Sequence, residues 1–187
     1  MAYWTTLPGD QLGRYAEYLS RLLFAKSGMD VYLPEIDNQG IDLVVRSSAG
    51  NFYEIQCKAR RQLNYFYLEK TKFPLSDARY LCLLLFLEAE REDPQIFLIP
   101  SRAWERSNAL FVDRRYQGKK SPPEWGLQFS VRNMPLLERY RVRQSKKGLT
   151  KRCRQQPPRQ AVNRLWKLEH HHCRLRPAST AVPELVR

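Results

Sequence analysis

The stretch Gly40–Lys58, GIDLVVRSSAGNFYEIQCK, decides the fold of this chain of 187 residues. Two runs of strand-forming residues, Ile41–Arg46 and Asn51–Lys58, flank a short polar turn that ends at Gly50. Alternating strand-like runs on either side of a glycine-containing turn are typical of a β-hairpin. We therefore expect two neighbouring antiparallel strands here.

Three polar side chains of this hairpin are candidates for a functional site. Side chains alternate across a strand, so Gln56 and Lys58 share one face of the second strand, while Asp42 lies in the first. If the strands are neighbours, the three groups converge near one end of the sheet. A carboxylate, an amide oxygen and an ammonium together can hold a hard cation and a phosphate.

The alternative is that Asp42 and Lys58 form an ordinary solvated pair across two strands. The strand around Asp42 is otherwise almost continuously apolar, which is typical of a strand buried on both faces. A lone buried carboxylate is costly unless it is paired or binds a metal. This cost favours the site over the solvated pair.

Length and composition predict one domain with a sizeable core plus tails. No apolar run approaches the ~18 residues of a membrane span, and the first residues lack the basic start and apolar run of a signal peptide. We therefore expect no membrane contact. The four cysteines show no close spacing, which indicates free thiols and a cytoplasmic location.

The charge is concentrated at one end of the chain. Residues 1–140 hold 19 basic and 17 acidic side chains, a net charge of +2, whereas residues 141–187 hold 13 and 2, a net charge of +11. We expect a folded domain over 1–140 and a basic, disordered tail over 141–187. Such a tail can bind nucleic acid without sequence preference.

The histidines exclude one class of mechanism. All three lie at 170–172, in the run LEHHHC, so the expected domain has no histidine for a Ser-His-Asp or Cys-His arrangement. The run has no metal-site spacing with Cys153 and resembles a tag remnant, so it is left out of the functional argument.

Periodicity predicts the remaining elements. Leucines at helical spacing indicate an amphipathic helix over Gln11–Ser27, with Asp10 as its N-cap. Further strands are expected at Asp30–Pro34, Asn64–Lys70, Tyr80–Leu87, Gln95–Ile99 and Gly126–Arg132, short helices at Pro100–Arg106 and Met134–Tyr140, and a loop at Phe111–Trp125. Glu17 flanks the apolar stripe of the first helix, where Arg14 and Arg21 are at the right spacing to pair with it.

The order of these motifs resembles the PD-(D/E)XK nuclease superfamily. The matching residues are GRYAE at Gly13–Glu17, GIDLVV at Gly40–Val45 and EIQCK at Glu54–Lys58, with 25 residues from Glu17 to Asp42 and 14 from Asp42 to Gln56. The chain is most similar to the Q-x-K branch, as in Mrr-type restriction and homing endonucleases. The resemblance covers about residues 10–110 and implies an α/β fold, a restriction-endonuclease-like αβββαβ core with a mixed sheet flanked by helices.

The resemblance also implies roles for individual residues. Asp42 is the main Mg²⁺ ligand, Gln56 takes the place of the second acid, and the backbone carbonyl of Cys57 completes the protein ligands; Mn²⁺ is a substitute ion. Lys58 orients or helps to deprotonate the attacking water, and Glu17 approaches from the helix as an outer ligand. The implied activity is metal-dependent hydrolysis of DNA phosphodiester bonds, of restriction, homing or repair type, in which a homodimer can cut both strands.

Several cations are candidates for contacts with DNA, each with the alternative of an ordinary surface cation: Arg60, Arg61, Lys70, Lys72, Lys119 and Lys120. Tyr65, Phe66 and Tyr67 can stack on bases, although two of the three are expected in the core.

Two rival functions stay open at this point. The first is a domain of the same fold that binds nucleic acid without cutting it, because Gln56 brings no charge to the metal site. The second is a plain α+β interaction domain with a basic tail.

Overall fold

The structure is a computed structural model that describes residues 3–36, 39–87, 93–118 and 120–142. The tail predicted over 141–187 and the candidate Lys119 therefore fall outside the described residues, apart from positions 141 and 142. The described part contains two α-helices and eight strands: α1 (Gly9–Lys26), β1 (Asp30–Tyr32), β2 (Leu43–Arg46), β3 (Phe52–Arg60), β4 (Phe66–Glu69), β5 (Arg79–Leu85), β6 (Gln95–Pro100), β7 (Phe111–Arg114), β8 (Glu124–Leu127) and α2 (Met134–Leu137). Short 3-10 helices lie at Tyr3–Thr5, Ser101–Glu105, Val131–Asn133 and Glu138–Tyr140.

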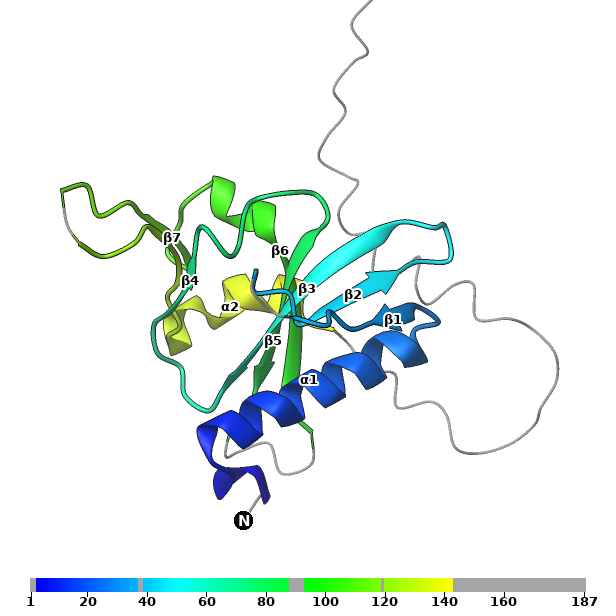
Figure 1. Cartoon of the computed structure of the whole chain (residues 1–187). Coiled ribbons are helices and arrows are strands. Elements are labelled where there is room, and N and C mark those ends of the chain that lie inside the picture. Colours follow the sequence, from blue (N-terminus) through cyan, green and yellow to red (C-terminus); the bar gives the residue numbers. More distant parts are fainter. Residues whose placement is uncertain (1–2, 37–38, 88–92, 119, 143–187) are drawn as a thin grey trace, which may run out of the picture. The chain divides into compact units, whose positions relative to one another are not determined.

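The larger sheet has five strands in the order β1-β2-β3-β5-β6 (Figure 1). β3 and β5 are parallel and every other neighbouring pair is antiparallel, so the sheet is mixed. All seven residues of β5 are buried, as expected for a central strand with protein on both faces. The predicted α/β fold class, a mixed sheet flanked by helices, is confirmed.

The predicted hairpin is confirmed as β2 and β3. Leu43 pairs with Ile55 and Arg46 with Phe52, and the Gly50 amide donates to the Ser47 carbonyl at 2.8 Å to close the turn. Gly50 has a φ of +88°, a left-handed conformation that glycine adopts without steric cost. The turn therefore fixes the register that the strand pattern predicts.

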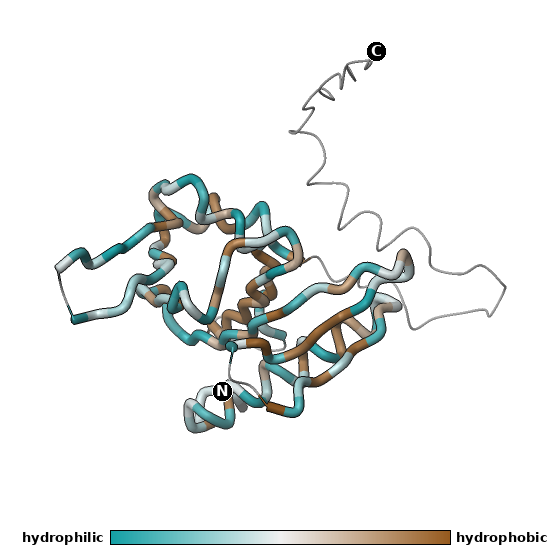
Figure 2. The backbone as a smooth tube through the Cα atoms, turned by 45° about the horizontal axis from the view of Figure 1, so that its top comes forward, coloured by the Kyte–Doolittle hydropathy of each residue, from teal (hydrophilic) through white to brown (hydrophobic). Residues whose placement is uncertain are grey.

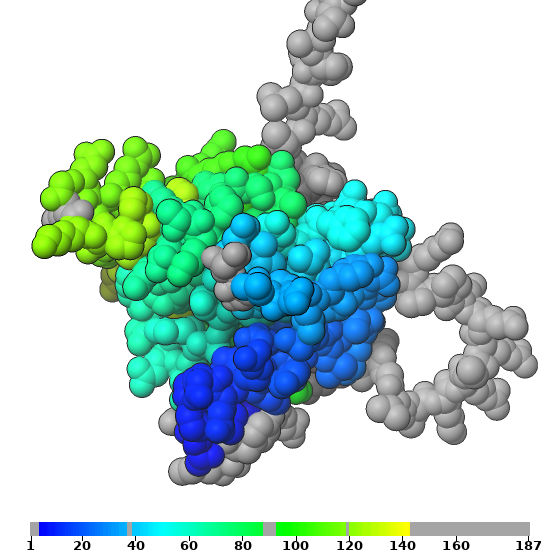
Figure 3. All heavy atoms as spheres, viewed as in Figure 1, coloured from blue at the N-terminus to red at the C-terminus, as the bar shows by residue number. Residues whose placement is uncertain are grey.

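Helix α1 covers one face of the larger sheet and packs along β3 and β1 (Figures 1 and 3). Its buried side chains recur every four residues, at Leu12, Ala16, Ser20 and Phe24. The Ser20 hydroxyl donates to the Ala16 carbonyl at 2.8 Å and lies 3.4 Å from the Cys82 sulfur. Cys82 of β5 lies opposite Cys57 of β3 in the strand register, so both side chains lie on the face of the sheet that α1 covers.

The opposite face of the sheet packs against a second, three-stranded sheet in the order β4-β8-β7. Between them lies an apolar cluster that includes Leu81, Leu83, Phe97 and Leu127. Trp104 is buried in it and donates its indole N–H to the Gly126 carbonyl at 2.8 Å. Hydropathy follows this arrangement, because the apolar segments lie on the strands while the loop between β7 and β8 is hydrophilic (Figure 2).

Four expectations from the sequence need correction. The last strand, predicted over Gly126–Arg132, is β8 at Glu124–Leu127, and Val131–Asn133 is a 3-10 helix. Helix α1 begins at Gly9 after Pro8, so Asp10 lies in the first turn and is not the N-cap. The predicted loop Phe111–Trp125 contains β7 and the start of β8, which pair with each other, and β8 also pairs with the distant β4. The connection from β3 to β5, where the αβββαβ order has a helix, forms β4 and turns.

Candidate functional site

Asp42 and Cys57 meet at the edge where β2 begins. The Asp42 amide donates to the Ile55 carbonyl at 3.0 Å, and its carboxylate Oδ2 accepts the Cys57 amide at 2.5 Å. Both polar groups of a strand residue point to the same side, so the Cys57 carbonyl also faces this edge. A carboxylate and a backbone carbonyl are therefore directed to one place.

Gln56 and Lys58 point away from α1, toward the second sheet. Their partners in β5, Leu81 and Leu83, belong to the apolar cluster on that side, whereas Cys57 between them faces α1. The two side chains line a cleft of about 260 Å³ together with residues of β4 and the turn that follows it: Tyr67, Leu68, Glu69 and Lys72. The predicted common face of Gln56 and Lys58 is confirmed.

The side-chain oxygen of Gln56 is buried and accepts no hydrogen bond from the described residues. The residue is 7% exposed, and its Oε1 has no hydrogen-bond partner among the described residues. A buried polar atom without a partner is costly, and such an atom in a folded protein needs an explanation. An oxygen that lacks a donor is suited to a cation.

The backbone at Gly40 packs directly against this side chain. Gly40 has a φ of +66°, and a Cβ built there would lie 2.8 Å from the Gln56 Nε2 atom and 3.2 Å from the Lys72 carbonyl oxygen. Only glycine fits both the backbone conformation and the close approach. Gly40 is therefore part of the support that holds the Gln56 amide in place.

Arg79, which the sequence reasoning missed, ties this support together. Its side chain is 2% exposed, and its guanidinium donates to the Glu54 carboxylate at 2.6 Å, to the Gln39 carbonyl at 2.6 Å and to the Lys72 carbonyl. The residue opens the otherwise apolar run RYLCLLL, and a cation at the start of a buried strand is the signal that could have found it. Arg79 thereby holds in place the backbone at Gln39 and Lys72, beside the Gln56 side chain.

Glu17 lies on α1, the helix on the opposite face of the sheet. Its carboxylate is 3.0 Å from Arg14 and 3.5 Å from Arg21, the pairing that the sequence offered as the alternative. The structure thus places Gln56 and Lys58 in one cleft, and Asp42 at the edge of the sheet next to that cleft. Glu17 lies apart from them and pairs with two arginines. A role for Glu17 as an outer metal ligand stays a prediction.

The cationic candidates differ in their surroundings. Arg61 donates to the carbonyls of Trp4, at 2.8 Å, and Leu7, and Lys70 pairs with Asp113 above the ring of Trp125. Both of these cations therefore serve the fold. Arg60 and Lys72 line clefts beside Lys58, and Lys120 is exposed.

The two described cysteines, Cys57 and Cys82, carry free thiols, as the sequence predicts. A hydrogen bond with Cys82, together with burial, raises the pKa of the Cys57 thiol well above its ordinary value. The raised pKa favours the neutral thiol of Cys57 over the thiolate.

The oxygen groups at this edge fit a hard divalent cation. One carboxylate, one amide oxygen and one strand-edge carbonyl are the donor types that Mg²⁺ takes when it keeps several waters and binds substrate phosphate. In the described part of the chain, no three His, Cys, Asp or Glu side chains gather to hold a metal. The proposed ligand set therefore carries only one negative charge, but its oxygen donors are of the types that Mg²⁺ binds.

Solved structures that resemble this chain include two nucleases. A bacterial homing endonuclease aligns with a TM-score of 0.42 and 16% identity over 72% of this chain and 86% of its own. A Holliday junction resolvase from the archaeal hyperthermophile Archaeoglobus fulgidus aligns with a TM-score of 0.37 and 16% identity over 62% of this chain and 91% of its own. No family model and no curated protein matches the chain. In the part of the chain with described coordinates, no helix is both long and apolar enough to cross a membrane.

Proposed function

We propose that this chain is a metal-dependent endonuclease that hydrolyses phosphodiester bonds in DNA. The observation that carries the proposal is the buried Oε1 of Gln56, which has no hydrogen-bond partner in the described part of the chain and lies on the same strand face as Lys58. Asp42 adds the only charge of the ligand set at the adjoining sheet edge. These are the three groups that the sequence pattern predicts for a phosphodiester hydrolase.

Each residue has a distinct task in this proposal. Asp42, Gln56 and the Cys57 carbonyl would hold Mg²⁺ or Mn²⁺. A bound ion of this kind lowers the pKa of water and offsets negative charge on a phosphate. Lys58, a mobile ammonium with three N–H donors, binds a phosphate oxygen and orients the attacking water.

The surroundings support binding of a polyanion at this place. Lys58, Arg60 and Lys72 all line the clefts beside the candidate ligands. Lysine and arginine side chains supply the electrostatic, sequence-independent part of DNA affinity. The proposal includes a cytoplasmic location, in which free thiols persist, and a homodimer for cuts in both strands.

The test is nicking of supercoiled plasmid with Mg²⁺ or Mn²⁺ by the full chain. We expect Asp42→Ala and Lys58→Ala to lose activity while both still fold. The matched controls are Asp10→Ala and Lys26→Ala, exposed residues of α1 on the other face of the sheet, which should cut at the wild-type rate. Nicking that survives Asp42→Ala would refute the proposal.

A second candidate function is binding of nucleic acid without cleavage. It is favoured by the proposed ligand set, in which Asp42 is the one carboxylate, because a set with less negative charge holds a divalent cation less tightly. Salt-sensitive binding to DNA without any nicking would support this reading over the first.

A further inference from the structure

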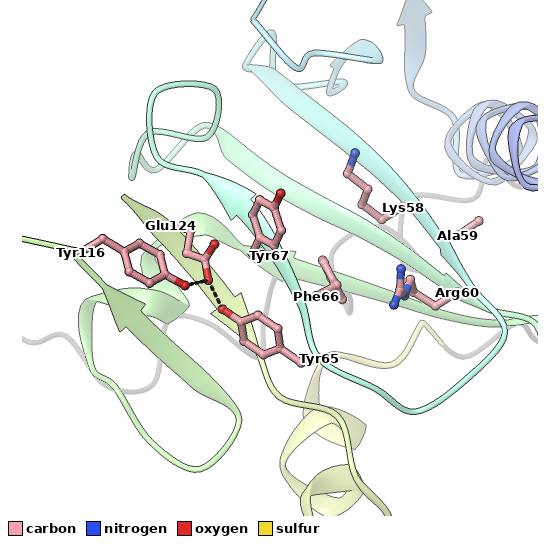
Figure 4. Close-up of a pocket in the computed structure, with 8 residues that line it drawn as sticks. All are labelled: Lys58, Ala59, Arg60, Tyr65, Phe66, Tyr67, Tyr116 and Glu124. Atoms are coloured by element: carbon pink, nitrogen blue, oxygen red, sulfur yellow. Dashed lines mark hydrogen bonds between the residues drawn. The ribbon is translucent and has the colours of Figure 1, made fainter. Parts of the chain in front are cut away.

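A second cleft adjoins the candidate site and shares Lys58 with it. It lies between β3 and the three-stranded sheet and has a volume of about 460 Å³, within the ~300–1,000 Å³ typical of small-molecule sites. Figure 4 shows residues 58–60 of β3 on one wall and Tyr65, Tyr67, Tyr116 and Glu124 on the other. We refer to these lining residues, with Phe66, as the tyrosine cleft.

The side of the tyrosine cleft opposite β3 carries a buried carboxylate. Glu124 is 6% exposed, and its Oε1 accepts the hydroxyl protons of both Tyr65 and Tyr116, the latter at 2.9 Å (Figure 4). Burial and the hydrogen bond to Glu124 raise the pKa of the Tyr65 phenol, so it stays protonated. Both tyrosine hydroxyls donate their protons to Glu124, so the phenol oxygens and the carboxylate are left as hydrogen-bond acceptors. This side of the cleft therefore favours a ligand that donates N–H groups.

The side of the cleft formed by β3 has the opposite character. Lys58 and Arg60 line it, and the Arg60 guanidinium lies 5.5 Å from the ring centre of Phe66. Tyr67 is 52% exposed and lines both this cleft and the smaller one that contains Gln56. An exposed aromatic ring beside cations is the combination that proteins use to stack a base while holding its phosphate.

The charges decide which way a ligand would lie. A phosphate at the Glu124 side would meet a buried carboxylate, whose charge Arg114 offsets only in part with its Nε 3.9 Å from the Glu124 Oε1, whereas at the Lys58 side it meets two cations, Lys58 and Arg60. A nucleotide therefore fits with its phosphate at Lys58 and its base directed toward Glu124. Lys58 is also the residue that binds the reacting phosphate in the proposed function. The base in the cleft therefore belongs to the nucleotide next to the phosphodiester bond that is cut.

We propose that the tyrosine cleft receives one unstacked nucleobase next to the phosphate that is cut. This inference rests on the proposed function and names its substrate class: DNA with an unpaired nucleotide at the cleavage position, as in single strands, flaps and branches. A base inside a duplex must first be unstacked at a cost of a few kcal/mol, a cost that is least for an unpaired base.

The carboxylate also sets a preference among bases. Adenine, cytosine and guanine each carry an amino group that can donate to Glu124, as a carboxylate accepts the amino group of cytosine in direct readout. Thymine offers carbonyl oxygens beside its N–H, and these repel a carboxylate. An unpaired thymine is therefore the poorest ligand of the four.

The experiment measures the affinity of the full chain in EDTA, where metal-dependent cutting is off. The probes are a fluorescent DNA duplex with one unpaired guanine and the same duplex fully paired. Because both probes meet the same basic tail, a difference between them reports on the folded domain. We expect tighter binding of the unpaired probe, and a loss of about 5- to 150-fold in Tyr67→Ala but not in Tyr67→Phe.

The matched control is Tyr18→Ala, which removes a tyrosine of 56% exposure from α1 and should leave both affinities unchanged. Replacing the unpaired guanine by thymine should weaken binding, and Glu124→Gln should reduce that difference. Equal affinity for the two probes, with no effect of Tyr67→Ala, would overturn the inference. Plasmid nicking without any preference for unpaired DNA would also overturn it while leaving the proposed function intact. Preferential binding without cleavage would support the cleft and refute the nuclease.

Discussion

The glycine at position 40 gives a sharp test of how Gln56 is held. An alanine there would adopt a φ of +66° and place its Cβ 2.8 Å from the Gln56 Nε2 atom. The left-handed conformation costs an L-residue about 1–2 kcal/mol, and the contact forces the Gln56 amide to move. We therefore expect Gly40→Ala to lose about 1–2 kcal/mol of unfolding free energy and most of the nicking activity.

Gly28 provides the matched control for this change. It has a φ of +78°, but a Cβ there would meet nothing within 4 Å. Gly28→Ala should therefore lose a similar unfolding free energy, measured by urea denaturation, and keep its activity at the same folded fraction. If Gly40→Ala nicks plasmid as fast as Gly28→Ala, the position of the Gln56 amide does not matter and the reasoning fails.

Three further changes test other parts of the account. Burial alone would raise the pKa of Asp113, but hydrogen bonds from Lys70 and Arg115 outweigh it and lower the pKa below its ordinary value. A lowered folded-state pKa stabilises the fold above the unfolded pKa and this contribution is lost as pH falls, so Asp113→Asn should lower the Tm at neutral pH and match wild type in strong acid. Leu83→Ala, at a position with 0% exposure, should cost about 2–5 kcal/mol in urea denaturation. Arg61→Ala should lower stability without changing DNA affinity in a filter-binding assay, whereas Arg60→Ala should weaken DNA binding.

The hairpin and its site could be predicted because their signals are local. The alternation of Asn51–Lys58 sets which side chains share a face, and Gly50 fixes the turn that pairs the strands. The common face of Gln56 and Lys58 follows from these two features alone. The same local logic predicted α1, whose buried residues recur at helical spacing.

The second sheet could not be predicted because its central strand, β8, pairs on one side with β4, which is distant in sequence. β7 has only four residues, is followed by a stretch rich in Lys, Arg and Pro, and forms by pairing with β8. Glu124 follows two prolines and reads as an exposed acid, yet Tyr65 from far along the chain buries it. Tertiary contacts of this kind override local propensity.

The candidates for contacts with DNA show the same limit. Adjacent arginines at 60 and 61 are indistinguishable in sequence, but successive side chains on a strand point to opposite faces. Arg61 is directed to the carbonyls of Trp4 and Leu7, whereas Arg60 lines the tyrosine cleft. Only the position of the N-terminal segment separates the two roles.

Binding of Mn²⁺ to the full chain, followed by electron paramagnetic resonance, tests the central claim most directly. We predict one bound ion in the wild type, loss of that ion in Asp42→Ala, and tighter binding in Gln56→Glu, because the added carboxylate restores a second charge beside Asp42. Binding should be unchanged in Asp10→Ala, on the far side of the sheet. An ion held equally well by the wild type and by Asp42→Ala would contradict the account.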